Sequence, residues 1–389
     1  LMTVDGNLTI RDTDDIAPVG AGPEDESFFV DNDAGVNQAI TLGAGNDDVA
    51  GISTLTFGQD VNVFTQGGDI RLYGDDIDID LTVGNEATIT TLSDGMGADG
   101  ATTTDDGIIG LGTGPFGGAG NGNLQNIGIA GDGGGSVYIT TGHLAQSIDI
   151  GVGVGGAGEL ELTEAELRRI STPTTLDADD DGTETDPTTA MEGIVIGYIN
   201  DATTTLAYQT TAGTISVTDD VDLSGGIGFD MEVVDTNYAN NLALVTDNTD
   251  PKAITDGQDG ILVVGSSLTV NQLYAEAAGG IDLTVDLADE TVTAVAPPIT
   301  YNNTFVEAHS TTLGDIVIDQ NDVDTNNEAL EIEATWFRDP SGAGLSEGIT
   351  TVDGNIIVQS DEEIEVVNGS FVSAQGSYVV MEVNIYDGI

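Results

Sequence analysis

Short runs in which apolar and polar residues alternate recur along the whole chain. Alternation with a period of two is the signature of β-strands that bury one face. The clearest runs are residues 69–73, 77–81, 137–139, 148–150, 214–217, 281–285, 315–318 and 356–358. Helix-like periodicity is confined to residues 161–170. The pattern therefore predicts an all-β protein with one short helix.

A glycine-led phrase opens many of these runs. It consists of Gly, a small polar residue and then apolar, polar and apolar residues. Copies or close variants begin at Gly6, Gly68, Gly135, Gly213, Gly280, Gly314 and Gly354. Residues 3–10 and 351–358 carry nearly the same phrase, and Gly314 and Gly354 stand 40 residues apart, twice the 20 that separate Gly260 from Gly280. Degenerate repeats of this length without helices are typical of solenoids.

We therefore predict a parallel β-helix, a single β-solenoid that spans residues 1–389. In such a fold glycine serves the corners, where a positive φ is needed, and Val, Ile and Leu point inward. The alternative is a string of tandem β-sandwich domains. The Asn-Gly pairs at Asn121 and Asn368 would suit hairpins, but a sandwich does not call for the recurring glycine-led phrase.

Two insertions interrupt the repeat. Residues 94–135 are extremely rich in glycine, and residues 171–192 are rich in Asp, Glu and Thr. The first insertion reads as an irregular surface loop that also contains tight corners. The second reads as an acidic loop, and neither insertion indicates a domain boundary.

A family resemblance is carried by residues 158–170, which read G-E-L-E-L-T-E-A-E-L-R-R-I, and by the later stretch G-I-V-I-G at 193–197. These residues resemble a rung of filamentous-haemagglutinin-type secreted exoproteins and adhesins, in which L-x-L-T-x-x-E-L-x-x-I leads into G-x-L-x-I-G. The resemblance covers about residues 135–235 and is loose elsewhere. It implies a right-handed parallel β-helix, secretion, and an adhesive or cell-surface role. The chain departs from the family pattern by the acidic insertion between the two stretches and by its extreme charge.

The charge balance excludes several classes of partner. The chain has 68 acidic and 6 basic residues among 389, a formal charge of −62, and no cysteine. It lacks the Lys and Arg that bind nucleic-acid phosphates or an anionic membrane surface. No disulfide, zinc–thiolate site or cysteine nucleophile is possible, and no apolar run approaches the ~20 residues of a membrane helix. The chain opens in strand-like alternation, which fits a processed chain or a segment of a longer polypeptide.

Calcium is the expected neutralising ion, because carboxylates are its preferred ligands. Residues 177–182 place Asp at positions 1, 3 and 5 and Gly at position 6 of a calcium loop, although Thr188 stands where a bidentate Glu is expected. Residues 43–49 resemble half of a glycine-aspartate calcium repeat, of which one copy cannot build a site. The candidate ligands are Asp177, Asp179, Asp181, Glu184, Asp186, Asp47 and Asp48. The alternatives are a solvated acidic loop and an ordinary turn.

Other chemistry finds little support in the sequence. His143 and His309 are isolated along the chain and are expected to be structural or surface residues. No Ser-His-Asp spacing and no phosphate-cradling loop is evident. Carboxylates are too numerous to indicate a glycosidase pair, and few basic groups are present to bind uronates. Asn7, Asn302 and Asn368 lie in Asn-x-Ser/Thr sequons and are candidate glycosylation sites.

The sequence thus predicts a secreted structural or adhesive β-solenoid, stabilised by calcium, that assembles head to tail into an extracellular filament or surface layer. Its expected partners are other copies of itself, and glycans or a host or cell surface. The alternatives are a polysaccharide-active β-helix enzyme and a calcium- or protein-binding module of a larger surface protein that does not assemble.

Overall fold

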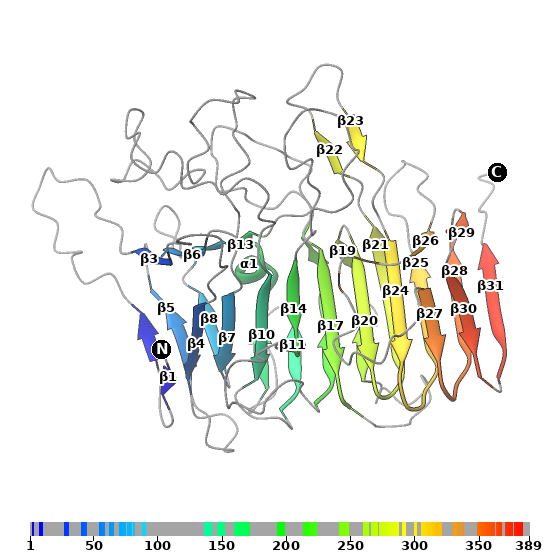
Figure 1. The fold of residues 1–389 in the computed structure, drawn as a ribbon, viewed down its shortest axis with the longest axis horizontal. Coiled ribbons are helices and arrows are strands. Elements are labelled where there is room, and N and C mark those ends of the chain that lie inside the picture. The colour runs from blue at the N-terminus through cyan, green and yellow to red at the C-terminus, as the bar shows by residue number, and fades with distance from the viewer. Residues whose placement is uncertain are drawn as a thin grey trace, which may run out of the picture.

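The structure is a computed structural model. The residues that it describes are 2–3, 8–10, 27–30, 40–44, 54–58, 62–65, 70–74, 76–79, 81, 88–90, 136–141, 146–151, 159–171, 193–198, 213–223, 241–248, 260–263, 266–270, 272–287, 290–292, 299–301, 305–320, 330–333, 335, 337, 348–361, 363–367, 370–375 and 377–383. Their strands stand side by side along one long axis, from β1 at one end to β31 at the other (Figure 1).

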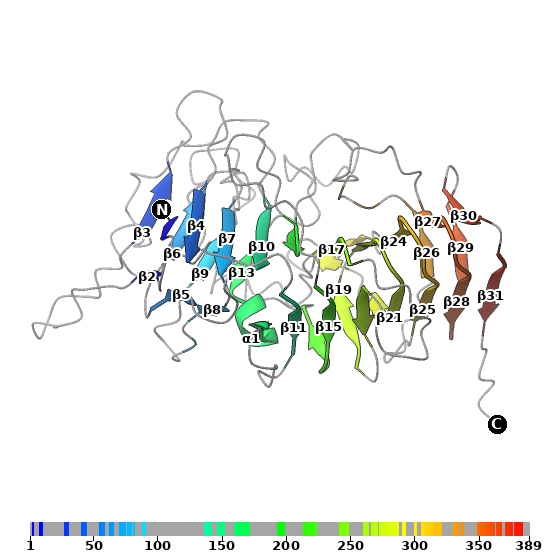
Figure 2. The ribbon, with the colours of Figure 1, turned by 90° about the horizontal axis from the view of Figure 1, so that it is seen from below.

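Long parallel sheets form the faces of the coil, and Figure 2 shows them as separate faces around the long axis. Among the described residues, the first sheet has twelve strands, which are, in spatial order, β1 (Met2–Thr3), β4 (Ile40–Ala44), β7 (Ile70–Gly74), β10 (Val137–Thr141), β14 (Ile194–Ile196), β17 (Leu242–Thr246), β20 (Leu273–Ala277), β24 (Phe305–Ser310), β26 (Leu330–Ile332) and β29 (Ile364–Val366), with β27 (Gly348–Thr351) also paired to β24 and β30 (Phe371–Ala374) paired to β27.

The second sheet has ten described strands, which are β12 (Leu160–Leu162), β11 (Ile148–Ile150), β15 (Ile215–Val217), β18 (Ile261–Val263), β21 (Ile281–Leu287), β25 (Ile316–Gln320), β28 (Ile356–Ser360) and β31 (Val379–Val383), with β19 (Leu268–Val270) also paired to β21 and β16 (Val221–Asp222) paired to β19. Smaller sheets are formed by β13 (Ile170–Ser171), β9 (Thr88–Thr90), β6 (Asn62–Thr65) and β3 (Ser27–Val30), by β2 (Leu8–Ile10), β5 (Thr54–Phe57) and β8 (Asp76–Ile79), and by the antiparallel pair β22 (Glu290–Val292) and β23 (Ile299–Tyr301).

The predicted parallel β-solenoid is confirmed, and the tandem-sandwich alternative is wrong. Every pairing between described strands is parallel except β22–β23, whereas sandwiches are built from antiparallel sheets. Successive rungs stack in register, so that Ile281, Ile316 and Ile356 are direct partners, and all three are fully buried. Such columns form one apolar core that extends from Leu42 to Val358. The period-two alternation of the sequence sets this inward-facing row.

The glycines that lead the phrase lie where consecutive rungs touch. A Cβ on Gly354 would overlap the carbonyl of Gly314, and a Cβ on Gly314 would overlap the backbone nitrogen of Gly280. Gly314 also has a φ of +135°, in the region that favours glycine. A Cβ on Gly213 would meet the carbonyl of Gln146 in the same way. The repeated glycine is therefore required by close contact between rungs.

The small polar residue after that glycine links rungs by hydrogen bonds. The backbone N–H and side-chain amide of Asn355 both donate to Oδ1 of Asp315, at 2.7 and 3.0 Å. The backbone N–H of Tyr378 in turn donates to Oδ1 of Asn355 at 3.5 Å. The glycine-led phrase thus has three parts. Its glycine forms a corner that only glycine fits, its small polar residue forms hydrogen bonds between rungs, and its apolar residues belong to a strand.

The chain departs from a simple coil between β11 and β14. β12 follows β11 in the sequence, yet it lies between β8 and β11, and β13 pairs with β9. The chain therefore steps back toward the preceding rung before β14 continues the first sheet. The connection contains helix α1 (Glu164–Leu167), which confirms the predicted short helix and is shorter than residues 161–170.

A capping box explains why this helix forms. The Thr163 hydroxyl accepts from the backbone N–H of Glu166 at 3.2 Å, and the Glu166 carboxylate accepts from the backbone N–H of Thr163 at 2.8 Å. The other oxygen of Glu166 accepts from the backbone N–H of Ile79, which ties α1 to β8. The apolar positions of the motif, Leu160, Leu162, Leu167 and Ile170, are all buried in the core. The L-x-L-T-x-x-E-L-x-x-I pattern is thus a strand, a capped turn of helix and a strand.

Candidate functional site

The sites that the sequence predicts lie outside the described residues and stay predictions. These are the candidate calcium ligands Asp47, Asp48, Asp177, Asp179, Asp181, Glu184 and Asp186, the sequon residues Asn7, Asn302 and Asn368, the glycine-rich insertion 94–135, and all of the acidic insertion except Ser171. His143 lies outside them as well. Within the part of the chain that the structure describes, no group of three or more His, Asp or Glu residues could hold a metal ion.

The outward face of the first sheet is the most unusual surface among the described residues. Strands β10, β17 and β20 are buried at every position, so both faces of the sheet are covered there. An outward-facing aromatic and aliphatic cluster, separate from the main core, is formed by Tyr73, Tyr138, Val195, Tyr198, Ala243, Val245, Tyr274 and Phe337. A solenoid needs an apolar core only on its inward side. The second cluster therefore indicates that the outward face of the first sheet has a role besides closing the coil.

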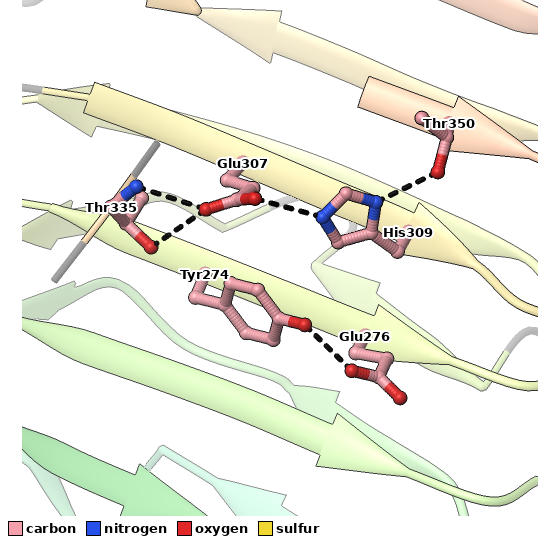
Figure 3. A network of polar contacts seen from close by, with 6 residues as sticks. All are labelled: Tyr274, Glu276, Glu307, His309, Thr335 and Thr350. Carbon is pink, nitrogen blue, oxygen red and sulfur yellow. Dashed lines mark hydrogen bonds and ion pairs between the residues drawn. The ribbon is translucent and has the colours of Figure 1, made fainter. Parts of the chain in front are cut away.

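A buried polar network adjoins this cluster (Figure 3). The imidazole of His309 is only 1% exposed and lies between Thr350 and Glu307. Its Nδ1 is 2.8 Å from the Thr350 hydroxyl, and its Nε2 is 3.0 Å from Oε1 of Glu307. Because an ionised carboxylate can only accept, Nε2 carries the proton that it donates to Glu307. In the neutral imidazole Nδ1 then accepts from the Thr350 hydroxyl. Hydroxyl, imidazole and carboxylate therefore form one continuous chain of hydrogen bonds.

The carboxylate of Glu307 is itself held from its other side. Its Oε2 accepts from the backbone N–H of Thr335 at 2.9 Å and from the Thr335 hydroxyl at 3.1 Å. With His309 on Oε1, both oxygens are occupied. A buried carboxylate is tolerated when its hydrogen bonds are satisfied in this way. Glu307 thus fixes the orientation of the imidazole and is fixed in turn by the segment that carries Thr335.

A second buried pair lies on the adjoining strand. The hydroxyl of Tyr274 donates to Oε2 of Glu276 at 2.6 Å, and both residues lie on β20. The Tyr274 ring is 5.6 Å from the His309 ring and 4.9 Å from the ring of Phe337, measured between centroids. An aromatic wall therefore borders the imidazole, while the Glu276 carboxylate is directed to the tyrosine hydroxyl.

Strand register explains how these residues meet. On β24 the side chains of Glu307 and His309 alternate with the core residues Val306 and Ala308, so both face outward. His309 is the register partner of Glu276 on β20 and of Thr350 on β27. The structure thus brings Thr350 beside an imidazole 41 residues away in the sequence.

His309, which is isolated along the chain from other histidines, thus has hydrogen-bond partners in the structure, and the prediction that it is a structural or surface residue stays a prediction. The sequence does contain one signal, because Glu307 and His309 stand two residues apart and share a face of a strand. Thr350 could be placed only once the register of β24 and β27 was known, since a shift of one residue would turn it away.

A row of carboxylates marks the second sheet. Burial, and then the charge of Asp319, raises the pKa of Asp282 above its ordinary value of 3.8. Burial, and then the charge of Asp361, raises the pKa of Asp319 in the same direction. Raised values mean that the folded chain holds these protons more tightly than the unfolded chain does. These groups therefore favour folding below about pH 4, and the contribution is lost as the pH rises through their raised values.

We expect Asp319→Asn to raise the melting temperature at pH 7 by a small amount, on the order of 1 °C. The reason is that the substitution removes a desolvated negative charge near Asp282 and Asp361. The advantage over the wild type should shrink as the pH is lowered through the raised pKa of Asp319, because the wild-type carboxyl is then increasingly protonated. Thermal melts followed by circular dichroism across this range measure it. Asp353→Asn, at an exposed turn position, is the matched control, and an equal shift in both variants would contradict the argument.

The last described rung exposes a different kind of surface. Val379, Met381 and Val383 of β31 lie in register with Ile356, Val358 and Ser360 of the preceding rung, which are buried. The three β31 side chains are 41–44% exposed, although they occupy the same inward-facing row. Other large exposed apolar side chains in this region are Val352, Val366, Phe371, Tyr378 and Val380. We call β29, β30 and β31 the terminal edge; on one side each of them pairs with no other described strand.

Comparisons with known proteins found no matching family model, no matching curated protein and no matching solved structure. The resemblance of residues 158–170 and 193–197 to haemagglutinin-type exoproteins thus stays a prediction. Among the described residues, none of the helices has both the length and the apolar character to cross a membrane.

Proposed function

We propose that this chain is a secreted structural or adhesive β-solenoid that assembles head to tail into an extracellular filament or surface layer. The observation that carries the proposal is the terminal edge, where an inward-facing apolar row is open to solvent. Exposed strand edges are templates for pairing with another chain, and contiguous exposed apolar surface marks interaction sites. The outward faces of such an assembly would be the surfaces that meet glycans or a cell surface.

The proposed occupant of the terminal edge is the first rung of a second copy. β2 carries Leu8, Thr9 and Ile10 within a phrase that nearly repeats residues 351–358, which contain the start of β28. A strand that repeats the pattern of β28 is suited to stack on β31, because β31 already stacks on β28 in register. Such a contact joins two different surfaces and can repeat without limit, which generates filaments.

The charge of the chain sets the condition for this assembly. Two copies that each carry a formal charge of −62 repel one another unless counterions intervene. Salt screens exposed charges beyond roughly 8 Å at physiological ionic strength, and calcium would neutralise carboxylates directly. We therefore expect assembly to strengthen as sodium chloride or calcium chloride is added.

We expect Met381→Asp to abolish assembly without unfolding the protein. The substitution places a carboxylate in the middle of the exposed row, where stacking of another rung would bury it unpaired. Sedimentation velocity and negative-stain electron microscopy, at low and high salt and with calcium, measure the change. Leu81→Asp is the matched control, because Leu81 is also an exposed large apolar residue but lies beyond β8, away from the terminal edge. Wild-type protein that stays monodisperse under all of these conditions would refute the proposal.

A further inference from the structure

We infer that Thr350 is a nucleophile, activated by His309 and Glu307, that cleaves carboxylic esters by acyl transfer. The signature of such a site is a hydroxyl in hydrogen-bond reach of an imidazole that a third group orients. Here the hydroxyl-to-imidazole distance is 2.8 Å and the imidazole-to-carboxylate distance is 3.0 Å. The activity is independent of filament assembly, because the network lies on the outward face of the first sheet and includes no residue of the terminal edge.

The exposure of the three groups suits their roles. His309 and Glu307 are 1% and 6% exposed, so the base and its orienting partner are shielded from water. Thr350 is only partly buried, so this end of the network is the one nearest to solvent. The two Thr335 donors hold Glu307, which is therefore a positioning residue that acts through the imidazole.

The proposed reaction balances with water as the only co-reactant. The Oγ atom of Thr350 bonds to the ester carbonyl carbon while its proton passes to Nδ1 of His309. The bond from that carbon to the alkoxy oxygen then breaks, and the alcohol leaves with the proton from Nδ1. Water attacks the acyl group on Thr350 and gives a proton to Nδ1, and the bond to Oγ breaks as that proton returns to Thr350. The sum is an ester and water converted to a carboxylic acid and an alcohol.

Charge restricts the substrate to neutral or cationic esters. Glu307 lies behind the imidazole, and Glu276 is the register partner of His309 on the strand opposite Thr350. Together with the formal charge of −62, these carboxylates repel an anionic acyl or alkoxy group. The buried Tyr274 ring packs beside the imidazole, and Phe337 packs against Tyr274, so these rings support the base from the side away from Thr350. A neutral ester is therefore the expected substrate class.

The first experiment exposes folded wild-type protein to a fluorophosphonate–biotin probe and maps the adduct by peptide mass spectrometry. We expect the label on Thr350, and Thr350→Ser, which keeps a hydroxyl, should also be labelled there. Thr350→Val should lose the label while its thermal melt stays cooperative. The matched control is Thr218→Val, because the Thr218 hydroxyl bonds to the carboxylate of Asp149 at 2.9 Å. An unlabelled Thr350 in folded wild-type protein would overturn the inference.

The second experiment measures hydrolysis of para-nitrophenyl acetate and of the anionic mono-para-nitrophenyl succinate. We expect the neutral ester to be the better substrate and Thr350→Val to reduce the rate to that of buffer. His309→Gln should reduce kcat by about 100-fold or more, the usual contribution of a general base. Glu307→Gln should lower kcat and leave KM unchanged, a split that a purely structural role would not produce. A wild-type rate that Thr350→Val leaves unchanged would contradict the inference.

Discussion

We expect Gly314→Ala to destabilise the solenoid by about 3 kcal/mol or more. Two independent costs combine at this position. A non-glycine residue held at a φ of +135° carries strain of roughly 1–3 kcal/mol. The added Cβ would also overlap the backbone of Gly279 and Gly280, and forced overpacking costs about 1–3 kcal/mol. Because the obstacle is backbone in the adjacent rung, no side chain can rotate away to relieve it.

Chemical denaturation followed by circular dichroism measures this change in the free energy of unfolding. Asp353→Ala is the matched control, since Asp353 is exposed in the corresponding corner one rung later and should change stability by less than about 0.5 kcal/mol. Equal stability of Gly314→Ala and the control would show that the corner can widen. It would contradict the explanation that close contact between rungs requires the repeated glycine.

The second large effect is expected for Glu307→Ala. Truncation removes the acceptor for His309 and for both donors of Thr335, and these groups would be left without it in a buried site. Leaving a buried donor without an acceptor costs about 1–3 kcal/mol, and this substitution removes the acceptor of more than one donor. We therefore expect a loss of about 3 kcal/mol in the free energy of unfolding, measured by the same denaturation experiment.

Two further variants separate this effect from a general loss of side-chain volume. Glu307→Gln keeps an oxygen that can accept from Thr335 and should retain most of the stability. Glu365→Ala removes an exposed carboxylate from β29 of the same sheet and should be close to neutral. A neutral Glu307→Ala would mean that the network contributes nothing to the folded state.

The contacts that stabilise the solenoid and the candidate site both depend on stacking between rungs. The glycine corners, the Asp315–Asn355 ladder and the Glu307–His309–Thr350 network each join residues that lie far apart in the sequence and adjacent in space. A substitution in one rung therefore affects the adjacent rungs. This is expected of solenoids, in which each repeat contacts mainly the repeats beside it.

Much of the fold could be predicted from local patterns. The alternation at 281–285, 315–318 and 356–358 predicted strands that bury one face, and β21, β25 and β28 do so. The glycine-led phrase predicted rung corners on the ground that a positive φ is needed there. Gly314 has such a φ, whereas Gly213 and Gly354 are required by close contact with the backbone of the adjacent rung, which the sequence did not indicate. The step back between β11 and β13 was not predictable, because it depends on which earlier strands β12 and β13 join and not on any local propensity.

The sequence by itself determined that this protein is all-β, and a repeated glycine with few helix signals favoured a parallel solenoid over tandem sandwiches, since each of these patterns is a local property of the chain. Its composition determined the strong negative charge and the absence of cysteine chemistry. Only the tertiary structure decided the candidate site. The position of Thr350 beside His309 depends on the register between β24 and β27, and register is set by packing of the whole inward face, not by the residues that meet on the outward one.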